Sequence, residues 1–266
     1  MLELIFFIKF IVAVAVVLVL AFLAEKVSPR FAGIISGTPT GTAITLFFYG
    51  LEISPEFASN SAIFNLAGLL AMLTFFYLYY ISSKIIGRES ILVSSVFAII
   101  GYSIVTLILQ NIKFDQITAA LVAIISVPVF MYLFRKIPDS KVEKRIKLSN
   151  TILFIRALAA GTIILAITTL AKFVGPTWAG LFSAFPTTVF PMIILVQYTY
   201  GIKPVNTIIK NFPIGLPSLI LYSLTVYMAY PVIGIFFGTL LAYLAAIICL
   251  ILCLFIEKKS TNKASN

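Results

Sequence analysis

Long apolar stretches constrain this chain more than any other feature. A helix needs about 20 apolar residues to cross the hydrocarbon core of a bilayer. Nine such stretches occur, and they lack the alternation of apolar and polar residues that marks a strand of a membrane barrel. They therefore predict nine transmembrane helices, over residues 4–24, 32–51, 62–81, 91–110, 117–134, 152–171, 178–200, 212–230 and 232–256.

Composition also favours an all-α integral membrane protein surrounded by the lipid bilayer. Of the 266 residues, 61% are hydrophobic and 11% are charged, whereas a soluble domain carries about 25% charged residues. This excludes a soluble enzyme, a disordered chain and a nucleic-acid-binding module. There is no histidine, and all nine acidic residues lie at or beyond the ends of the apolar stretches. We therefore expect no enzymatic activity, no metal site and no cofactor.

Basic residues predict an orientation, because loops rich in Lys and Arg stay on the cytoplasmic side. The richest loop covers residues 135–150. With this loop inside, alternation across nine helices places sixteen Lys and Arg inside and three outside. We therefore expect a cell-membrane protein with its N-terminus outside and its C-terminus in the cytoplasm.

The chain also contains an internal repeat. A shift of 147 residues aligns positions 5–40 with 152–187 without gaps, at fourteen identities in thirty-six positions. Each repeat then has four predicted helices, over residues 1–110 and 148–257. Residues 111–147 supply a linker helix and a basic loop, and 258–266 a disordered tail. Five helices precede the second repeat, so it enters the membrane from the opposite face, as in many secondary transporters.

The second helix of each repeat contains a helix-breaking motif. The motifs are Ser-Gly-Thr-Pro-Thr-Gly-Thr at 36–42 and Ser-Ala-Phe-Pro-Thr-Thr at 183–188. Proline removes a backbone hydrogen bond and clashes with the preceding turn. We expect half-helices that start near Pro39 and Pro186, with Thr38 and Ser183 as caps. A plain kink packed by small residues is the alternative.

Half-helix N-termini present free N–H groups and a partial positive charge, which suit a carboxylate or another small anion. Arg156 pairs with Lys9 under the same shift, and the two form candidate cationic gates. Snorkelling of both side chains to the interface is the alternative. The expected substrate site consists of Ser36, Gly37, Thr38, Pro39, Thr40, Thr42, Ser183, Pro186, Thr187, Thr188 and Arg156.

Other polar and aromatic residues near helix ends have simpler explanations. Asn65, Gln197 and Asn211 are expected to form hydrogen bonds between helices. An interfacial aromatic belt is expected from Trp178 and from Tyr77, Tyr79, Tyr80, Tyr222, Tyr227 and Tyr230.

Two short segments resemble a known family. Residues 179–191 contain Gly-Leu-Phe-Ser-Ala-Phe-Pro and a second proline, a pattern similar to that of the GlpM-like membrane proteins. The Ser-Gly-Thr-Pro segment at 36–39 is similar to the Ser-Gly-x-Pro version in longer bacterial relatives. The resemblance covers about two helices. It implies a four-helix unit, about one repeat here, and no substrate.

Together these features predict a secondary carrier or exporter of a small organic solute, anionic or neutral. Access to a midplane site between two broken helices would alternate between the two faces of the membrane. A channel-like pore lined by the same motifs and a non-transporting assembly or structural protein are the alternatives. Small inverted-repeat proteins often pair, so a homodimer is also an open expectation.

Overall fold

The computed structural model describes residues 28–86, 91–138 and 149–264, together with isolated positions between 7 and 18. Most of the first predicted helix, residues 4–24, therefore lies outside the described residues, as does Lys9.

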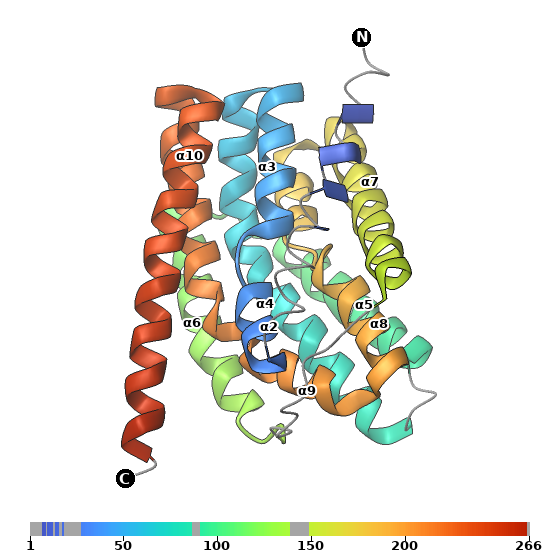
Figure 1. Ribbon diagram of the computed structural model, residues 1–266. Helices are drawn as coiled ribbons and strands as arrows, with labels where there is room; N and C mark the ends of the chain where they lie inside the picture. The colour runs from blue at the N-terminus through green and yellow to red at the C-terminus, as the bar shows by residue number, and fades with distance from the viewer. Residues whose placement is uncertain are drawn as a thin grey trace.

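Every element within the described residues is a helix, which confirms the predicted all-α class. Among the described residues, six helical stretches are long and apolar enough to cross a membrane, counting α2 and α3 as one, so the chain has the helices of a multi-pass membrane protein. Figure 1 shows them as one bundle, with the end of α10 along its side. The elements are α2 (Pro29–Ser36), α3 (Thr40–Glu52), α4 (Pro55–Ile86), α5 (Ile91–Leu109), α6 (Gln116–Phe134), α7 (Asn150–Ser183), α8 (Val189–Tyr200), α9 (Ile202–Asn211), the short η2 (Phe212–Ile214) and α10 (Leu216–Ala264).

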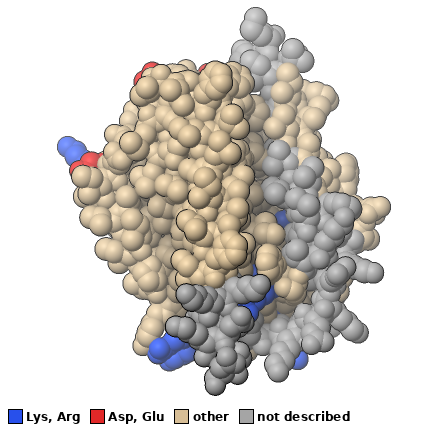
Figure 2. All heavy atoms as spheres, turned by 60° about the vertical axis from the view of Figure 1, so that its left-hand side comes forward, with Lys and Arg blue, Asp and Glu red and all other residues tan. Residues whose placement is uncertain are grey.

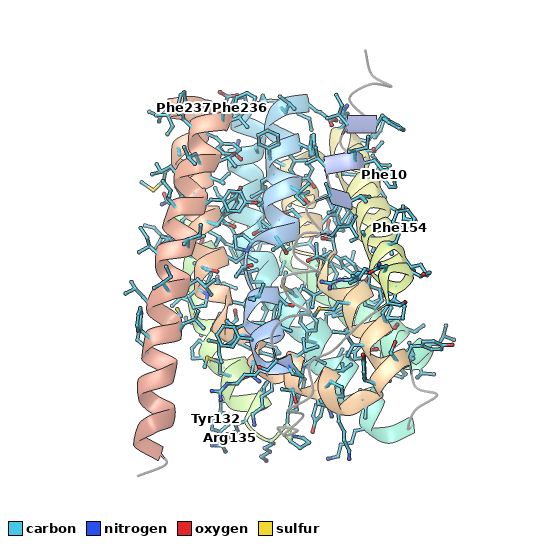
Figure 3. The ribbon with its side chains drawn as sticks, in the orientation of Figure 1. Phe10, Tyr132, Arg135, Phe154, Phe236 and Phe237 are labelled. Carbon is cyan, nitrogen blue, oxygen red and sulfur yellow. The ribbon has the colours of Figure 1, made fainter. Side chains whose placement is uncertain are left out.

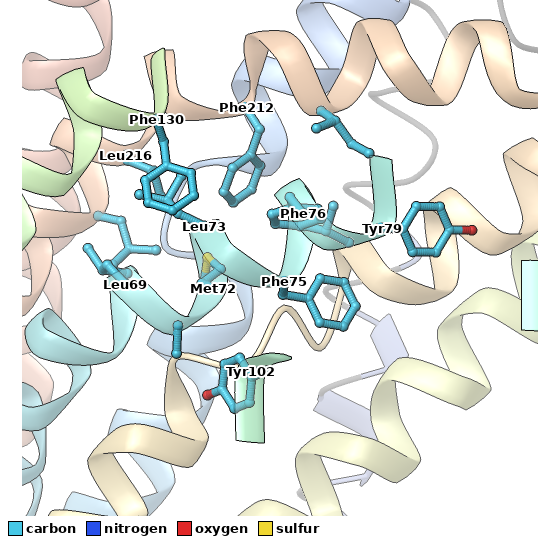
Figure 4. Close-up of a cluster of buried hydrophobic side chains, with 14 of the residues drawn as sticks. Leu69, Met72, Leu73, Phe75, Phe76, Tyr79, Tyr102, Phe130, Phe212 and Leu216 are labelled. Atoms are coloured by element: carbon cyan, nitrogen blue, oxygen red, sulfur yellow. The ribbon is translucent and has the colours of Figure 1, made fainter. Parts of the chain in front are cut away.

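The core is built around α4, which packs against α5, α6, α7 and α10. Phe75 and Phe76 of α4 are fully buried in the apolar cluster of Figure 4. Phe76 meets Phe212 with ring centroids 4.4 Å apart, which joins α4 to η2. By contrast, α5 and the second half of α10 expose large apolar side chains such as Leu92 and Phe236. Outward-facing apolar surface of this extent suits contact with lipid.

Charged side chains gather towards the ends of the bundle. In Figure 2 most visible acidic residues lie towards the upper end and most visible basic residues towards the lower end. Arg135 lies at the lower end in Figure 3 and stacks on Tyr132, with its guanidinium carbon 3.7 Å from the ring centroid. At the upper end, Lys172 of α7 forms a 2.9 Å ion pair with Glu52 of α3.

Three helices begin with a side chain that caps them. Ser28, Asp115 and Ser149 each accept a hydrogen bond from a backbone amide in the first turn of α2, α6 and α7. Such caps satisfy amides that have no partner within the helix. At Asp115, bonds from the Thr118 hydroxyl and amide also lower the pKa of the carboxyl group.

Two long helices contain a backbone reversal at a glycine. Gly175 of α7 has φ 75° and ψ 171°, and Gly234 of α10 has φ 78° and ψ 175°. Glycine is favoured here because it adopts positive φ without a steric penalty. The boundary between the predicted helices 212–230 and 232–256 therefore lies at Gly234, since Pro231 stays within the helix.

Two further segments differ from the sequence prediction. Residues 202–211, predicted as a loop, form α9 and bury Val205, Ile208 and Ile209 completely. The two lysines of α9 keep it too polar to be recognised as a membrane helix. The tail predicted as disordered from residue 258 continues α10 as far as Ala264. No proline or glycine interrupts that segment, and its lysines and alanine favour helix.

Glycines also allow two pairs of helices to cross at backbone contact. A β-carbon on Gly33 of α2 would overlap the Ile208 carbonyl of α9. A β-carbon on Gly180 of α7 would overlap the Ser61 carbonyl of α4. Gly33 and Gly180 are 147 positions apart, and so are Ser61 and Ile208. The repeat seen in the sequence therefore recurs in these contacts.

Gly180→Ala should therefore destabilise the protein, because neither backbone can withdraw without moving a helix. Overpacking of this kind costs about 1–3 kcal/mol. Thermal unfolding in detergent, followed by circular dichroism, should show a clear fall in midpoint. Thr199→Ala is the matched control, because Thr199 is exposed and bonds only to its own helix. Equal midpoints for the two variants would contradict the crossing.

Candidate functional site at the crossing of two broken helices

The two predicted breaks have the same backbone geometry. Gly37, after α2, has φ −77° and ψ −5°, and Ala184, after α7, has φ −79° and ψ −8°. The Gly37 amide donates to the Gly33 carbonyl at 3.2 Å, and the Ala184 amide donates to the Gly180 carbonyl at 3.3 Å. The two motifs that the sequence pairs therefore fold alike.

The equivalence continues past the prolines. The Thr40 amide donates to the Thr38 carbonyl at 2.7 Å, and the Thr187 amide donates to the Phe185 carbonyl at the same distance. These tight turns replace about one helical turn in each motif. Both breaks are thus interruptions of the helix, and not smooth kinks.

Hydroxyl groups in the motifs close the preceding helices and do not cap the following ones. Thr38 Oγ1 and Ser183 Oγ donate to carbonyl oxygens three residues earlier, at 2.6 and 2.7 Å. The prediction that Thr38 and Ser183 act as N-caps is therefore wrong. The next helices, α3 from Thr40 and α8 from Val189, begin without a side-chain cap.

The starts of α3 and α8 meet each other. Oγ1 of Thr40 and Oγ1 of Thr188 share a hydrogen bond of 3.0 Å. Thr42 Oγ1 donates to the Ser183 carbonyl at 3.1 Å, which places the start of α3 against the end of α7. The structure therefore brings residues of both predicted motifs into one crossing.

Thr187 contributes a buried hydroxyl to this crossing. Its side chain is 1% exposed, and Oγ1 has no hydrogen-bond partner. Oγ1 lies against Gly41 of α3, where a β-carbon would overlap it. A buried hydroxyl without a partner costs roughly 1–3 kcal/mol. A ligand that bonds to Thr187 would recover that energy.

Positive potential concentrates where the two helices begin. The first turns of α3 and α8 contain neither an acidic residue nor a side-chain cap. Each helix N-terminus carries a partial charge of about +0.5, because its first amides lack partners within the helix. Two such ends facing one crossing suit a ligand with hydrogen-bond acceptors or negative charge.

The buried side-chain amide of Asn65 supports the crossing through hydrogen bonds to neighbouring helices. Asn65 of α4 donates to Ser183 Oγ at 2.7 Å and accepts a bond from Ser223 Oγ at 2.9 Å. These bonds connect α4, α7 and α10, so the predicted bonding of Asn65 between helices is confirmed. Its position beside the second motif could not be read from the sequence.

Tyrosines also hold the end of α7. The Tyr49 hydroxyl of α3 donates to the Ala179 carbonyl at 3.0 Å, and the Tyr102 hydroxyl of α5 donates to the Leu181 carbonyl. The Leu181 carbonyl also accepts from the Ala184 amide at 3.2 Å, so the tyrosine hydroxyls add second bonds that tie the end of α7 to α3 and α5.

The predicted aromatic belt is wrong for part of its members. Tyr79, Tyr222 and Tyr230 are almost completely buried. Tyr79 donates to Gln197 Oε1 at 2.7 Å, which confirms a bond between helices for Gln197. Asn211 instead donates within α9. A tyrosine near a helix end is thus an ambiguous signal, since it suits both an interface and a buried acceptor.

The remaining motif residues lie next to the crossing. Ser36 Oγ donates to a carbonyl of its own helix at 2.6 Å and lies 3.9 Å from Met192 Sδ of α8. Gly37, Pro39 and Pro186 are buried. A cavity of about 240 Å³ opens beside the first break, where Thr38, Pro39 and Thr40 form one wall, and Ser218 and Tyr243 of α10 contribute to the other.

Arg156 lies on the first part of α7, before Gly175. Its side chain is 6% exposed, and Phe154, two residues earlier, lies away from both ends of the bundle in Figure 3. A side chain with so little exposed surface does not fit simple snorkelling to an interface. In sequence, Arg156 lies outside both motif segments.

In comparisons with known proteins, no family model, curated protein or solved structure matches the chain. The resemblance of residues 179–191 to the GlpM-like proteins therefore stays a prediction.

The bond between Asn65 and Ser183 should be measurable as a coupling energy. A double-mutant cycle with Asn65→Ala and Ser183→Ala should give about 0.6 kcal/mol, the average for polar bonds between membrane helices, and at most about 1.7 kcal/mol. Unfolding in sodium dodecyl sulfate provides the free energies. A cycle of Asn65→Ala with Thr225→Ala is the control, because Thr225 is only partly buried and bonds within α10. A coupling near zero in both cycles would contradict the network.

Proposed function

We propose that this protein is a secondary carrier for a small organic solute, anionic or neutral, that binds where the two broken helices cross. The observation that carries the proposal is the meeting of two uncapped helix starts through Thr40 and Thr188, next to the unpartnered hydroxyl of Thr187. A packing device would be expected to satisfy its own polar groups. This crossing instead leaves donors available to a ligand.

An inverted repeat is the second part of the proposal. Support comes from two equivalent contacts in which the two halves of the chain exchange roles. Gly33 packs on Ile208 and Gly180 packs on Ser61, so each half supplies the broken helix in one contact and the supporting helix in the other. This exchange is expected if a pseudo-two-fold axis passes through the crossing.

Transport by alternating access would follow from that arrangement. The solute's acceptor atoms would bind the Thr187 hydroxyl and those first-turn amides of α3 and α8 that do not already bond to the preceding turn, as the amides of Thr40 and Phe190 do. Rocking of one half against the other would open the crossing to one face of the membrane at a time. Described acidic residues are absent from both motif segments, so coupling would rely on solute exchange, or on Na⁺ held by hydroxyl and carbonyl oxygens.

Flux in proteoliposomes tests the proposal directly. We expect saturable uptake of at least one radiolabelled carboxylate among acetate, lactate, succinate, glutamate and stearate. Thr187→Val removes the free hydroxyl and keeps the shape, so the half-saturating concentration should rise roughly tenfold, the equivalent of one hydrogen bond.

Two variants serve as controls for that experiment. Thr187→Ser keeps the hydroxyl and should transport like the parent. Thr225→Val removes an exposed hydroxyl that bonds only to its own helix, and should also have no effect. Absence of saturable uptake for all five carboxylates, or equal uptake by Thr187→Val and the parent, would refute the proposal. Non-saturable flux would favour a pore.

The proposed orientation has its own test in the Cys249→Ala, Cys253→Ala background. A cysteine at Asn111, after α5, should react with an impermeant maleimide in intact cells. A cysteine at Lys136, after α6, should react only after permeabilisation. Both side chains are exposed. The reverse labelling pattern would show that the protein is inserted the other way round.

A further inference from the structure

A second cavity, of about 570 Å³, lies between α5 and α7 and reaches the second break. Its volume is within the range of about 300–1,000 Å³ that is usual for small-molecule sites. Phe185 of the break closes one part of it, and most other wall atoms are apolar. The apolar wall includes Ile99, Leu107, Ile163, Leu170, Trp178 and Phe182.

The cavity opens sideways, on the surface that faces lipid. Ile99, Leu107 and Leu170 line it and are 41%, 50% and 49% exposed. They belong to the same outward apolar surface as the other exposed residues of α5 and α7. A hydrocarbon chain could therefore enter from the bilayer without crossing a polar barrier.

The inner wall presents a buried hydroxyl group without a hydrogen-bond partner. Thr106 is 2% exposed, and its Oγ1 makes no hydrogen bond. The nearby Tyr102 hydroxyl is engaged by the Leu181 carbonyl. The cavity thus combines a long apolar wall with an unpartnered hydroxyl.

A smaller counterpart lies at the first break. Three residues of the α5–α7 cavity, Ile99, Ser103 and Phe185, are each 147 positions from a residue that lines the 240 Å³ cavity. Those partners are Ala246, Leu250 and Thr38. Each break therefore has a side cavity at the equivalent place, although the two differ in size.

We propose that the solute is amphipathic: its polar head binds at the crossing, and its single apolar chain occupies the α5–α7 cavity. This inference rests on the proposed function for the head group and adds the substrate class. The same chain chemistry is present in resident membrane lipid, so the experiment must separate a lipid that fills the cavity passively from an exchangeable single-chain ligand.

Trp178 makes the test direct, because it is the only tryptophan in the chain and lines the cavity. Bromine atoms quench tryptophan fluorescence at short range. In nanodiscs of unbrominated phosphatidylcholine, dibromostearate should quench Trp178 saturably, and excess stearate should reverse the quenching. Dibromosuccinate, which has no chain, should not quench.

Filling the cavity should abolish that signal. Ala166→Phe places a ring among the lining residues and should remove most of the saturable quenching. Thr169→Phe adds the same ring to an exposed position of α7 outside the lining, and should quench like the parent. Equal quenching in both variants would overturn the proposal.

Three further outcomes separate the possible failures. If brominated phosphatidylcholine in the disc quenches Trp178 and excess stearate does not relieve it, the cavity holds resident lipid only and the inference fails. If carboxylate uptake is saturable but dibromostearate does not quench, the carrier proposal stands and the amphipathic substrate is wrong. If dibromostearate quenches but no carboxylate is transported, the cavity is a chain-binding site and the carrier proposal fails.

Discussion

Unwound backbone inside an apolar bundle must find its hydrogen-bond partners within the protein, and the rest of this structure depends on how that requirement is met. Water is absent from the hydrocarbon core, so each unsatisfied amide or carbonyl is costly. Here two helices are interrupted, and their ends are brought to one crossing. The end of α7 receives hydroxyl donors from Tyr49, Tyr102 and Thr42. The starts of α3 and α8 receive no side-chain cap.

The two breaks share backbone geometry but differ in support. The residues 147 positions after Tyr49 and Thr42 are Val196 and Val189, whose side chains cannot donate hydrogen bonds. The second break is therefore held by donors from the first half of the chain. The first break borders a cavity.

Much of the architecture could be predicted from the sequence, because apolar length and helix-breaking residues act locally. The all-helical class and the positions of both breaks followed from such signals. The capping roles of Thr38 and Ser183 were wrong, because the same hydroxyl can close the helix before it or start the one after it. Local sequence does not decide between these two bonds.

Other features depend on tertiary contacts and could not be predicted. α9 forms because Val205 and its neighbours are buried against other helices, although two lysines lower its hydropathy. A side chain at position 41 would overlap Thr187, which lies against Gly41 from the other half of the chain, and this contact is not visible in the local sequence. The 147-residue shift indicates which segments are equivalent and meet. It does not predict which atoms of those segments face one another.

Thiol accessibility at the crossing tests the central claim most directly. Single cysteines at Thr40 and Thr187, in the Cys249→Ala, Cys253→Ala background, would be exposed to an impermeant methanethiosulfonate reagent from either side of the membrane. A cysteine at the exposed, lipid-facing Met228 is the control and should stay unreactive. If the crossing is a solute site with alternating access, both positions react, and the reactive side changes when transported solute is added. If both remain inert from both sides under every condition, the broken helices only pack against each other and the account is wrong.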